Sequence, residues 1–359
     1  MRVIRVLVVD DSAVVRQSTR FILESDPELQ VIGEAPNGEE AVRLAEQLKP
    51  DVITMDIRMP RMDGMEAIAN IMASNPAPIV VVTSIDLERD LGISTQATKA
   101  GAVAVLMRPT AIASPKHKAF AEKLIAQVKL MSAVKVIHRP RAVSAPARPS
   151  VSAPVMPSPS AADARARKIE IVAIGSSTGG PAALHQLLGA LPANFPTPIL
   201  IVQHISFGFV EGLASWLDAA CALRVKVAAN GERITSGTVY IAPDGNHLMT
   251  DRFGKIVLSQ TDPVGGFRPA VTVLFEAVAR SHESAALGII LTGMGSDGAK
   301  GMVALRNAGA WTIAQDEASC VVFGMPKEAM ALGAVTQVEP LARIAPRMVE
   351  LCAVEGTSR

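Results

Sequence analysis

The segment "IEIVAIGSSTGGPAALHQLL", residues 169–188, runs from an apolar stretch through two serines and two glycines into a helical pattern. This order predicts a strand, a tight turn and a helix, with a serine lifted above a sheet at the helix N-terminus. Read as G-x-S-x-G, residues 175–179 select Ser177 rather than Ser176 as the candidate nucleophile. A plain turn or a phosphate-binding loop remains an alternative, although the Gly-Lys-Ser/Thr of a P-loop does not follow.

Alternating strand runs and helical patterns continue on both sides of this segment. The apolar runs "VLVVD" and "PIVVVTS" precede it, and "PILIVQHI" and "ALGIILTG" follow it. Repeated strand–helix units predict an α/β protein with two doubly wound parallel sheets, whose ligands bind at the carboxyl ends of the strands. We expect a flavodoxin-like first domain and a Rossmann-like second domain with a β-hairpin insertion around 238–260.

A stretch rich in proline, serine and alanine separates the two domains. Residues 139–168 contain no aromatic residue and no periodic hydrophobic pattern. Such a composition cannot bury enough apolar surface to offset the entropy of ordering the chain. The predicted organisation is a first domain at 1–130, a linker at 131–168 and a second domain at 169–359.

Composition narrows the class of protein. The chain has 359 residues and a formal net charge of +1, so it lacks the broad basic field expected of a nucleic-acid-binding protein. Cys221, Cys320 and Cys352 are far apart and form no CxxC pair, which argues against a disulfide framework or a zinc site. No uncharged apolar run is long enough to span a bilayer. We therefore expect a cytoplasmic monomer that neither binds nucleic acid nor inserts into a membrane.

Polar residues end four of the predicted strands in the first domain. Asp10 and Asp11 end the first strand, and Asp56 ends the third. Thr83 and Arg108 end the fourth and the fifth. Clustered carboxylates repel one another unless a cation joins them, and oxygen ligands suit Mg²⁺. Asp56 is then a candidate acceptor of a phosphoryl group whose oxygens Thr83 and Arg108 hold, although single strand-end aspartates also serve as helix caps and turn residues.

The motifs "VVDDS", "MDIRMPRMDG" and "VVVTS" resemble the receiver domains of bacterial response regulators, and the resemblance covers about residues 1–130. It implies that Asp56 is the phosphoacceptor, that a histidine kinase supplies the phosphoryl group, and that Asp10 and Asp11 help to hold Mg²⁺. It also implies that Thr83 is the switch hydroxyl. Two positions depart from the pattern, because Arg108 stands where receivers carry lysine and Val105 where they usually carry an aromatic residue.

A serine nucleophile needs a base and an acceptor that orients the base. His204 ends the predicted strand "PILIVQHI", beside the strand that leads to Ser177, and Asp297 follows "ALGIILTGMGS" at another strand end. Asp297 also fits as the N-cap of the predicted helix "GAKGMVALRNAG", which begins at residue 298. The other histidines have less suitable positions in the sequence: His117, His138, His185, His247 and His282.

The stretch "GMGSDG" supports a second interpretation. Gly293, Gly295 and Gly298 spell the dinucleotide-binding pattern G-x-G-x-x-G after a strand, and Asp316 ends the next strand. The pattern falls late in the domain rather than in its first strand–helix unit, and a nucleotide site would leave Ser177 and its partners unexplained.

The motifs "IGSSTGGP", "VQH" and "LTGMGSDGAKGM" resemble the catalytic domain of chemotaxis protein-glutamate methylesterases over about residues 169–353. The resemblance implies Ser177 as nucleophile, His204 as base and Asp297 as its orienting partner. It also implies that Thr178 and the Met294 backbone lie near the oxyanion. The segment "ISFGFVEGL" after the histidine departs from the proline-rich loop usual in that family.

Together the two resemblances imply a phosphorylation-regulated serine hydrolase. It would demethylate glutamate methyl esters, and also deamidate glutamines, on methyl-accepting chemoreceptor-type proteins, with no metal in the esterase site. In the family's architecture the unphosphorylated receiver covers the esterase cleft. The altered loop after His204 leaves open a non-catalytic signalling adaptor, in which the receiver controls docking to a receptor or an enzyme.

This architecture yields a truncation test. Residues 169–359 expressed alone are expected to hydrolyse substrate faster than the unphosphorylated full chain, because removing a covering domain frees the cleft. Methanol release from methylated receptor, measured side by side for the two proteins, checks this. An unchanged or lower rate for the truncated protein would show that the receiver does not inhibit by covering.

Overall fold

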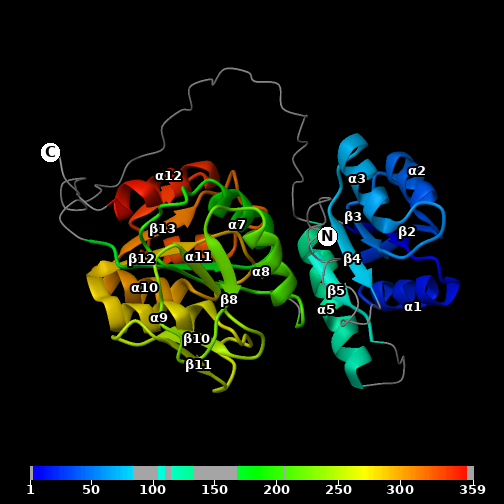
Figure 1. The fold of residues 1–359 in the computed structure, drawn as a ribbon. Helices are drawn as coiled ribbons and strands as arrows, with labels where there is room; N and C mark the ends of the chain where they lie inside the picture. Colours follow the sequence, from blue (N-terminus) through cyan, green and yellow to red (C-terminus); the bar gives the residue numbers. More distant parts are fainter. Residues whose placement is uncertain (1–2, 84–103, 110–114, 133–167, 206, 354–359) are drawn as a thin grey trace. The chain divides into compact units, whose positions relative to one another are not determined.

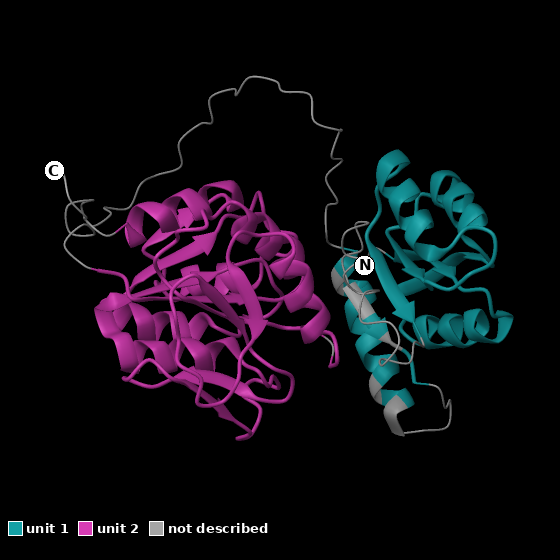
Figure 2. Cartoon of the chain, viewed as in Figure 1, with its two compact units in different colours: residues 1–148 teal, residues 149–359 magenta. Residues whose placement is uncertain are grey.

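The computed structural model describes residues 3–83, 104–109, 115–132, 168–205 and 207–353 (Figure 1). The chain divides into two compact units, residues 1–148 and 149–359 (Figure 2), which we describe separately. The expected linker at 131–168 lies almost entirely outside the described residues. No helix in the described ranges is both long and apolar enough to cross a membrane.

Unit 1 is built on a five-stranded sheet in the order β2-β1-β3-β4-β5, with every neighbouring pair parallel. This is the flavodoxin-like order, so the prediction for the first domain is confirmed. Its strands are β1 (Ile4–Val9), β2 (Leu29–Ala35), β3 (Val52–Met55), β4 (Ile79–Thr83) and β5 (Ala104–Met107). Its helices are α1 (Ala13–Glu24), α2 (Gly38–Leu48), α3 (Gly64–Ser74) and α5 (Pro115–Met131).

Local sequence explains where these elements begin. The strands are continuous apolar runs because both faces of the sheet are covered, and Val6–Val9 of β1 are at most 2% exposed. Asn37 and Asp63 cap α2 and α3, since their side chains accept the N–H groups of Glu40 and Glu66. Asp10 after β1, Asp56 after β3 and Thr83 at the end of β4 therefore lie at one edge of the sheet.

Unit 2 is built on a seven-stranded parallel sheet in the order β14-β13-β12-β6-β7-β9-β8. Its strands are β6 (Ile171–Ser176), β7 (Ile199–Gln203), β8 (Arg224–Val227), β9 (Thr238–Ile241), β12 (Ala286–Ile290), β13 (Trp311–Gln315) and β14 (Gln337–Glu339). A separate antiparallel hairpin consists of β10 (His247–Thr250) and β11 (Ile256–Ser259). The predicted doubly wound sheet with a hairpin insertion is confirmed, but the hairpin is shorter than 238–260, because β9 joins the main sheet between β7 and β8.

Helices cover both faces of this sheet (Figure 1). One face packs against α7 (Gly180–Gly189), α8 (Val210–Asp218) and α12 (Leu341–Cys352), and the other against α9 (Val271–His282), α10 (Ala299–Asn307) and α11 (Met325–Ala331). A short 3₁₀ helix, η1 (Glu283–Ala285), leads into β12. In β6, Val172 and Ile174 belong to one core, whereas Ile171 and Ala173 belong to the other.

The central strands β12, β6 and β7 bring three distant segments to one edge of the sheet. Ser176 of β6 pairs with Gln203 of β7, and Gly175 pairs with Ile290 of β12. The residues that follow these pairs leave the sheet together, because parallel neighbours end on the same side. The serine turn, His204 and the loop after β12 therefore meet at this edge.

Candidate active site

The serine turn separates its two serines by burial. Gly179, with φ 78°, precedes α7, and the Gly180 N–H donates to the Ser177 carbonyl at 2.8 Å. The Ser176 side chain is fully buried, and its Oγ donates to Gln203 Oε1 at 2.6 Å. Ser177 is only partly buried, and its N–H donates to the Thr292 carbonyl at 3.0 Å. Of the two hydroxyls, therefore, only that of Ser177 is accessible to a substrate.

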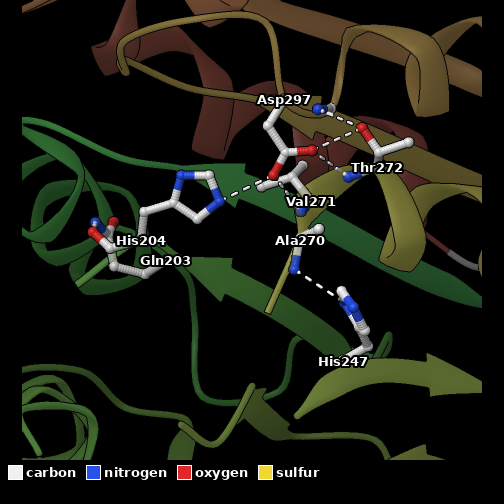
Figure 3. Close-up of polar contacts among 8 residues, drawn as sticks. Gln203, His204, His247, Ala270, Val271, Thr272 and Asp297 are labelled. Atoms are coloured by element: carbon white, nitrogen blue, oxygen red, sulfur yellow. Dashed lines mark hydrogen bonds and ion pairs between the residues drawn. The ribbon is translucent and has the colours of Figure 1, made fainter. Parts of the chain in front are cut away.

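His204 lies directly beside this turn, since its backbone N–H donates to the Ser176 carbonyl at 3.0 Å. Its Nε2 lies 2.9 Å from Asp297 Oδ2 (Figure 3). The Phe267 ring stacks on the imidazole, with centroids 3.9 Å apart and an interplanar angle of 3°. His204 Nδ1 is buried and has no hydrogen-bond partner among the described residues. This nitrogen is the one available to a nucleophile or a substrate.

The Asp297 carboxylate accepts four hydrogen bonds (Figure 3). Besides His204, the Val271 N–H donates to Oδ2 at 2.7 Å. The Thr272 N–H and hydroxyl donate to Oδ1 at 3.0 and 2.7 Å. The first turn of α9 thus binds the carboxylate through two of the N–H groups that a helix N-terminus leaves free. The alternative prediction, that Asp297 caps the following helix α10, is wrong, because the carboxylate caps α9.

This environment keeps Asp297 ionised. Burial by itself raises the pKa of the carboxyl, but the hydrogen bonds from His204 and Thr272 outweigh it, so the pKa of Asp297 lies below its ordinary value. An ionised carboxylate can only accept, so His204 Nε2 must carry the proton and donate it. The lone pair of His204 is then on Nδ1.

Thr178 follows Ser177 in the turn, and Met294 lies on the loop after β12 that approaches Ser177 through Gly293. The Thr178 carbonyl accepts the Thr292 hydroxyl at 3.0 Å. Met294 is 45% exposed and follows Gly293, where an added Cβ would lie 2.8 Å from Ser177 Cβ. The backbone N–H groups of Thr178 and Met294 have no acceptor within the part of the chain that is described. Two free amide donors therefore lie on the loops that enclose the serine.

The glycines of "GMGSDG" are explained without a nucleotide, by close packing at two positions and by a φ of 78° at Gly295. At Gly298, with φ 90°, an added Cβ would lie 2.6 Å from the Val271 side chain. Gly293 is required where its loop touches Ser177. Asp316 accepts hydrogen bonds from Ser319. Close packing at Gly293 and Gly298 and the backbone conformation of Gly295 therefore account for the glycine pattern, and the Asp316 carboxylate is used by a local turn.

His247 is fully buried on β10, and its hydrogen bonds occupy both ring nitrogens. Nδ1 accepts the Ala270 N–H at 3.2 Å (Figure 3). Nε2 lies 3.2 Å from the Asp262 carbonyl. Ala270 is the N-cap of α9, so His247 supports the same helix end that binds Asp297. It is a structural histidine rather than a second base.

The acidic site in unit 1 has the predicted composition. Oxygen atoms of Asp10, Asp11 and Asp56 lie within 4.8 Å of one another, and this is the one group of three potential metal ligands found in the described ranges. Burial, then the charge of Asp10, raises the pKa of Asp56 to about 7, while Arg108 opposes this. Thr83 Oγ1 is buried and has no hydrogen-bond partner within the described ranges. The all-carboxylate donor set fits a hard divalent cation such as Mg²⁺.

Two of the departures noted in the sequence, Val105 and the segment after His204, are only partly described by the structure. The backbone of Val105 in β5 pairs with Val81 in β4, but the Val105 side chain lies outside the described residues, as does all of Ser206. In the loop after His204, Phe207 is 72% exposed and the Gly208 N–H donates to Asp244 Oδ2 at 2.6 Å. An aromatic side chain therefore projects into solvent three residues from His204.

Comparisons with known proteins agree with this geometry. A family model described as CheB methylesterase matches residues 172–348, and one described as response regulator receiver domain matches 6–117. The protein-glutamate methylesterase/protein-glutamine glutaminase of Nitrosospira multiformis is 46% identical over 99% of this chain and 99% of its own. Protein-glutamate methylesterase/protein-glutamine glutaminase 4 of Myxococcus xanthus is 46% identical over 96% of this chain and 96% of its own length. The crystal structure of the Thermotoga maritima CheB methylesterase catalytic domain, 43% identical, covers 51% of this chain and 98% of that domain with a TM-score of 0.50.

The fold and the site together define a response regulator whose output domain is a hydrolase. The chain belongs to the CheB family of protein-glutamate methylesterases/protein-glutamine glutaminases. The predicted family, enzyme class and phosphorylation-regulated function are confirmed. The matches favour the enzyme over the adaptor that the altered loop left open.

Three residues that touch the site were not identified from the sequence: Gln203, Phe267 and Thr272. Gln203 carried a signal, because it is a polar residue at the end of an otherwise apolar strand run. Phe267 and Thr272 carried none, since their segment reaches the site only after α9 has packed against the sheet.

Asp297→Asn tests the role of the carboxylate. A neutral amide no longer holds the proton on His204 Nε2, so kcat should fall on the order of 10⁴-fold, as when the wrong tautomer forms in a triad. Thr272→Val is the control that keeps the charge: it removes the hydroxyl's hydrogen bond to Asp297 and the one it accepts from the Gly298 N–H, and it should cost far less. Methanol release by purified, folded variants measures both, and equal losses would contradict a specific role for the charge.

The lowered pKa of Asp297 also predicts that the effect of Asp297→Asn on thermal stability depends on pH. A carboxyl whose pKa is lowered by folding stabilises the protein at pH values above its pKa in the unfolded chain. This contribution is lost as the pH falls through its pKa in the folded protein. The difference in Tm between wild type and Asp297→Asn should therefore be largest near neutral pH and shrink below about pH 3.8. A difference independent of pH would contradict the assignment.

Proposed function

We propose that Ser177, His204 and Asp297 are the catalytic triad of this methylesterase. The observation that carries the proposal is the His204–Asp297 pair, whose one unpartnered ring nitrogen lies at the strand end beside the serine turn. The substrate is a glutamate methyl ester, or a glutamine amide, on a chemoreceptor-type protein. Esters and primary amides share one route, because both present a carbonyl carbon with a leaving group that needs a proton.

In the first step Ser177 Oγ attacks the side-chain carbonyl carbon while its proton passes to His204 Nδ1. Asp297 stays ionised and stabilises the imidazolium through Nε2. The proton is then transferred to the methoxide or amide leaving group, which departs as methanol or ammonia and leaves an acyl-serine. Water, deprotonated by Nδ1, attacks the acyl carbon, and the returned proton restores Ser177 as glutamate is released. This mechanism needs no metal.

The oxyanion of each tetrahedral intermediate would be bound by the free N–H groups of Thr178 and Met294. Thr178 follows the nucleophile, and its position at the entry to α7 adds the positive end of that helix dipole. Phe267 covers the imidazole face, which restricts the access of water to His204.

In the receiver we propose that Asp56 is the phosphoacceptor, with a histidine kinase as donor, and that the enzyme acts in the cytoplasm. Asp10, Asp11 and Asp56 would hold Mg²⁺, which supplies charge neutralisation for the incoming phosphoryl group. Thr83 offers its unpartnered hydroxyl to a phosphoryl oxygen, and Arg108 lies close enough to Asp56 to lower its pKa. An added Cβ at Gly64 would lie 2.1 Å from the Asp56 carbonyl, so this loop tolerates no side chain there.

Substitution of each serine distinguishes nucleophile from neighbour. Ser177→Ala should lower hydrolysis by several powers of ten, on the order of the loss from removing a nucleophile in other triads. Ser176→Ala should stay within a few-fold of wild type, because its hydroxyl is buried against Gln203. Methanol release from methylated receptor is the measurement, and comparable mild losses from both changes would refute the assignment.

Arg108→Lys tests the receiver. Arginine keeps the charge and can hold a phosphoryl oxygen, so Asp56 labelling by a small phosphodonor should change by only a few-fold. Lysine is a compact ammonium that can bridge carboxylate and phosphoryl oxygens, so the ratio of phosphorylated to unphosphorylated esterase rates should rise. Labelling and methanol release measured on the same samples separate the two effects. An unchanged or lower ratio would show that arginine transmits the signal at least as well.

A further inference from the structure

The Gln203 side chain connects the backbone of the two residues that carry the chemistry. Its Nε2 donates to the Ser177 carbonyl at 2.8 Å and to the His204 carbonyl at 2.7 Å. Its Oε1 accepts the Ser176 hydroxyl at 2.6 Å. Gln203 is 4% exposed, so these contacts are shielded from water. Both N–H groups of the amide and its oxygen are thus used.

These contacts also define which way the amide faces. Two carbonyl oxygens converge on one end of the side chain, and only the NH₂ group can donate to both. The opposite end is then an oxygen, which must be met by a donor, and the Ser176 hydroxyl supplies it. At Gly180 an added Cβ would lie 1.9 Å from Gln203 Oε1, so the first residue of α7 leaves the space that the amide occupies.

The position of this amide matters because the sheet ends there. The last backbone bond between the two strand ends runs from the His204 N–H to the Ser176 carbonyl. Beyond it Ser177 turns into α7 and His204 enters the loop toward α8. The Gln203 side chain continues the connection beyond this backbone bond, because its amide binds the carbonyl groups of Ser177 and His204.

We propose that Gln203 is a positioning residue that sets the distance between Ser177 and His204, and that Ser176 acts by holding Gln203 in its orientation. This inference rests on the proposed roles of Ser177 as nucleophile and His204 as base. It assigns the first of the two adjacent serines a function that is not catalytic. Small displacements at such a site are costly, since a misplacement of about 1 Å can lower a rate about 10²-fold.

The test uses the full chain with Gln203→Met, Ser176→Ala and the double substitution. Methionine keeps the length of the side chain and removes every hydrogen bond. The matched control is Thr197→Val, which removes a buried hydrogen bond to the Ile169 carbonyl at the other ends of the same two strands. The readouts are the rate of Ser177 labelling by a fluorophosphonate, kcat and KM for methanol release from methylated receptor, and Tm.

Gln203→Met should lower the labelling rate and kcat at least tenfold and leave KM within threefold, because the substrate contacts remain. Thr197→Val should lower Tm and leave both rates within twofold. Ser176→Ala should lower labelling a few-fold in the wild-type background and have no further effect when Gln203 is already methionine, as expected for residues that act through one another.

Wild-type labelling rates in both Gln203→Met and Ser176→Ala would overturn the proposal, as would additive losses in the double variant. If Gln203→Met does not fold, Gln203→Asn takes its place in the test. Asparagine keeps the amide but is too short to reach the two carbonyls, so the expected effects are the same. Failure of the triad itself is recognised separately, because Ser177→Ala would then retain hydrolysis whatever Gln203 does.

Discussion

The catalytic unit depends on one buried carboxylate. Asp297 binds the N-terminus of α9, the hydroxyl of Thr272 and the imidazole of His204 at the same time. Burying an isolated charge costs free energy, and each hydrogen bond to a charged group contributes about 1.5–3 kcal/mol of stabilisation. The carboxylate is therefore stable there only while its donors are in place. The packing of α9 against the sheet and the tautomer of His204 are therefore parts of one arrangement.

The two sites of the chain use aspartate in opposite ways. In the receiver, Asp10 and Asp11 add negative charge around Asp56, and burial raises the pKa of Asp56 to about 7. That environment favours a partner that brings positive charge. In the catalytic unit, hydrogen bonds lower the pKa of Asp297, which suits a group that must remain charged through a proton-transfer cycle. The difference lies in the neighbours, since both carboxyls follow parallel strands.

The adjacent serines show how burial separates identical side chains. Ser176 still belongs to β6, and its side chain is directed toward the neighbouring strand, where Gln203 receives it. Ser177 is the first residue beyond the strand, and it is partly exposed. Glycines beside the two serines let neighbouring elements pack closely against this turn. At Gly175 an added Cβ would lie 2.1 Å from Val271, the residue that opens α9.

The sequence by itself determined the two parallel sheets, the strand ends on which the chemistry lies, and the choice of Ser177, His204 and Asp297 as candidates, because apolar runs and the polar residues that end them are local patterns. Only the tertiary structure decided that Asp297 caps α9 rather than α10, that His204 presents Nδ1, and that Ser176 bonds to Gln203. It also decided that β9 belongs to the main sheet instead of the hairpin. These features depend on hydrogen bonds between residues as far apart as 93 positions, and such partners are chosen by the packing of whole helices and strands rather than by any local pattern.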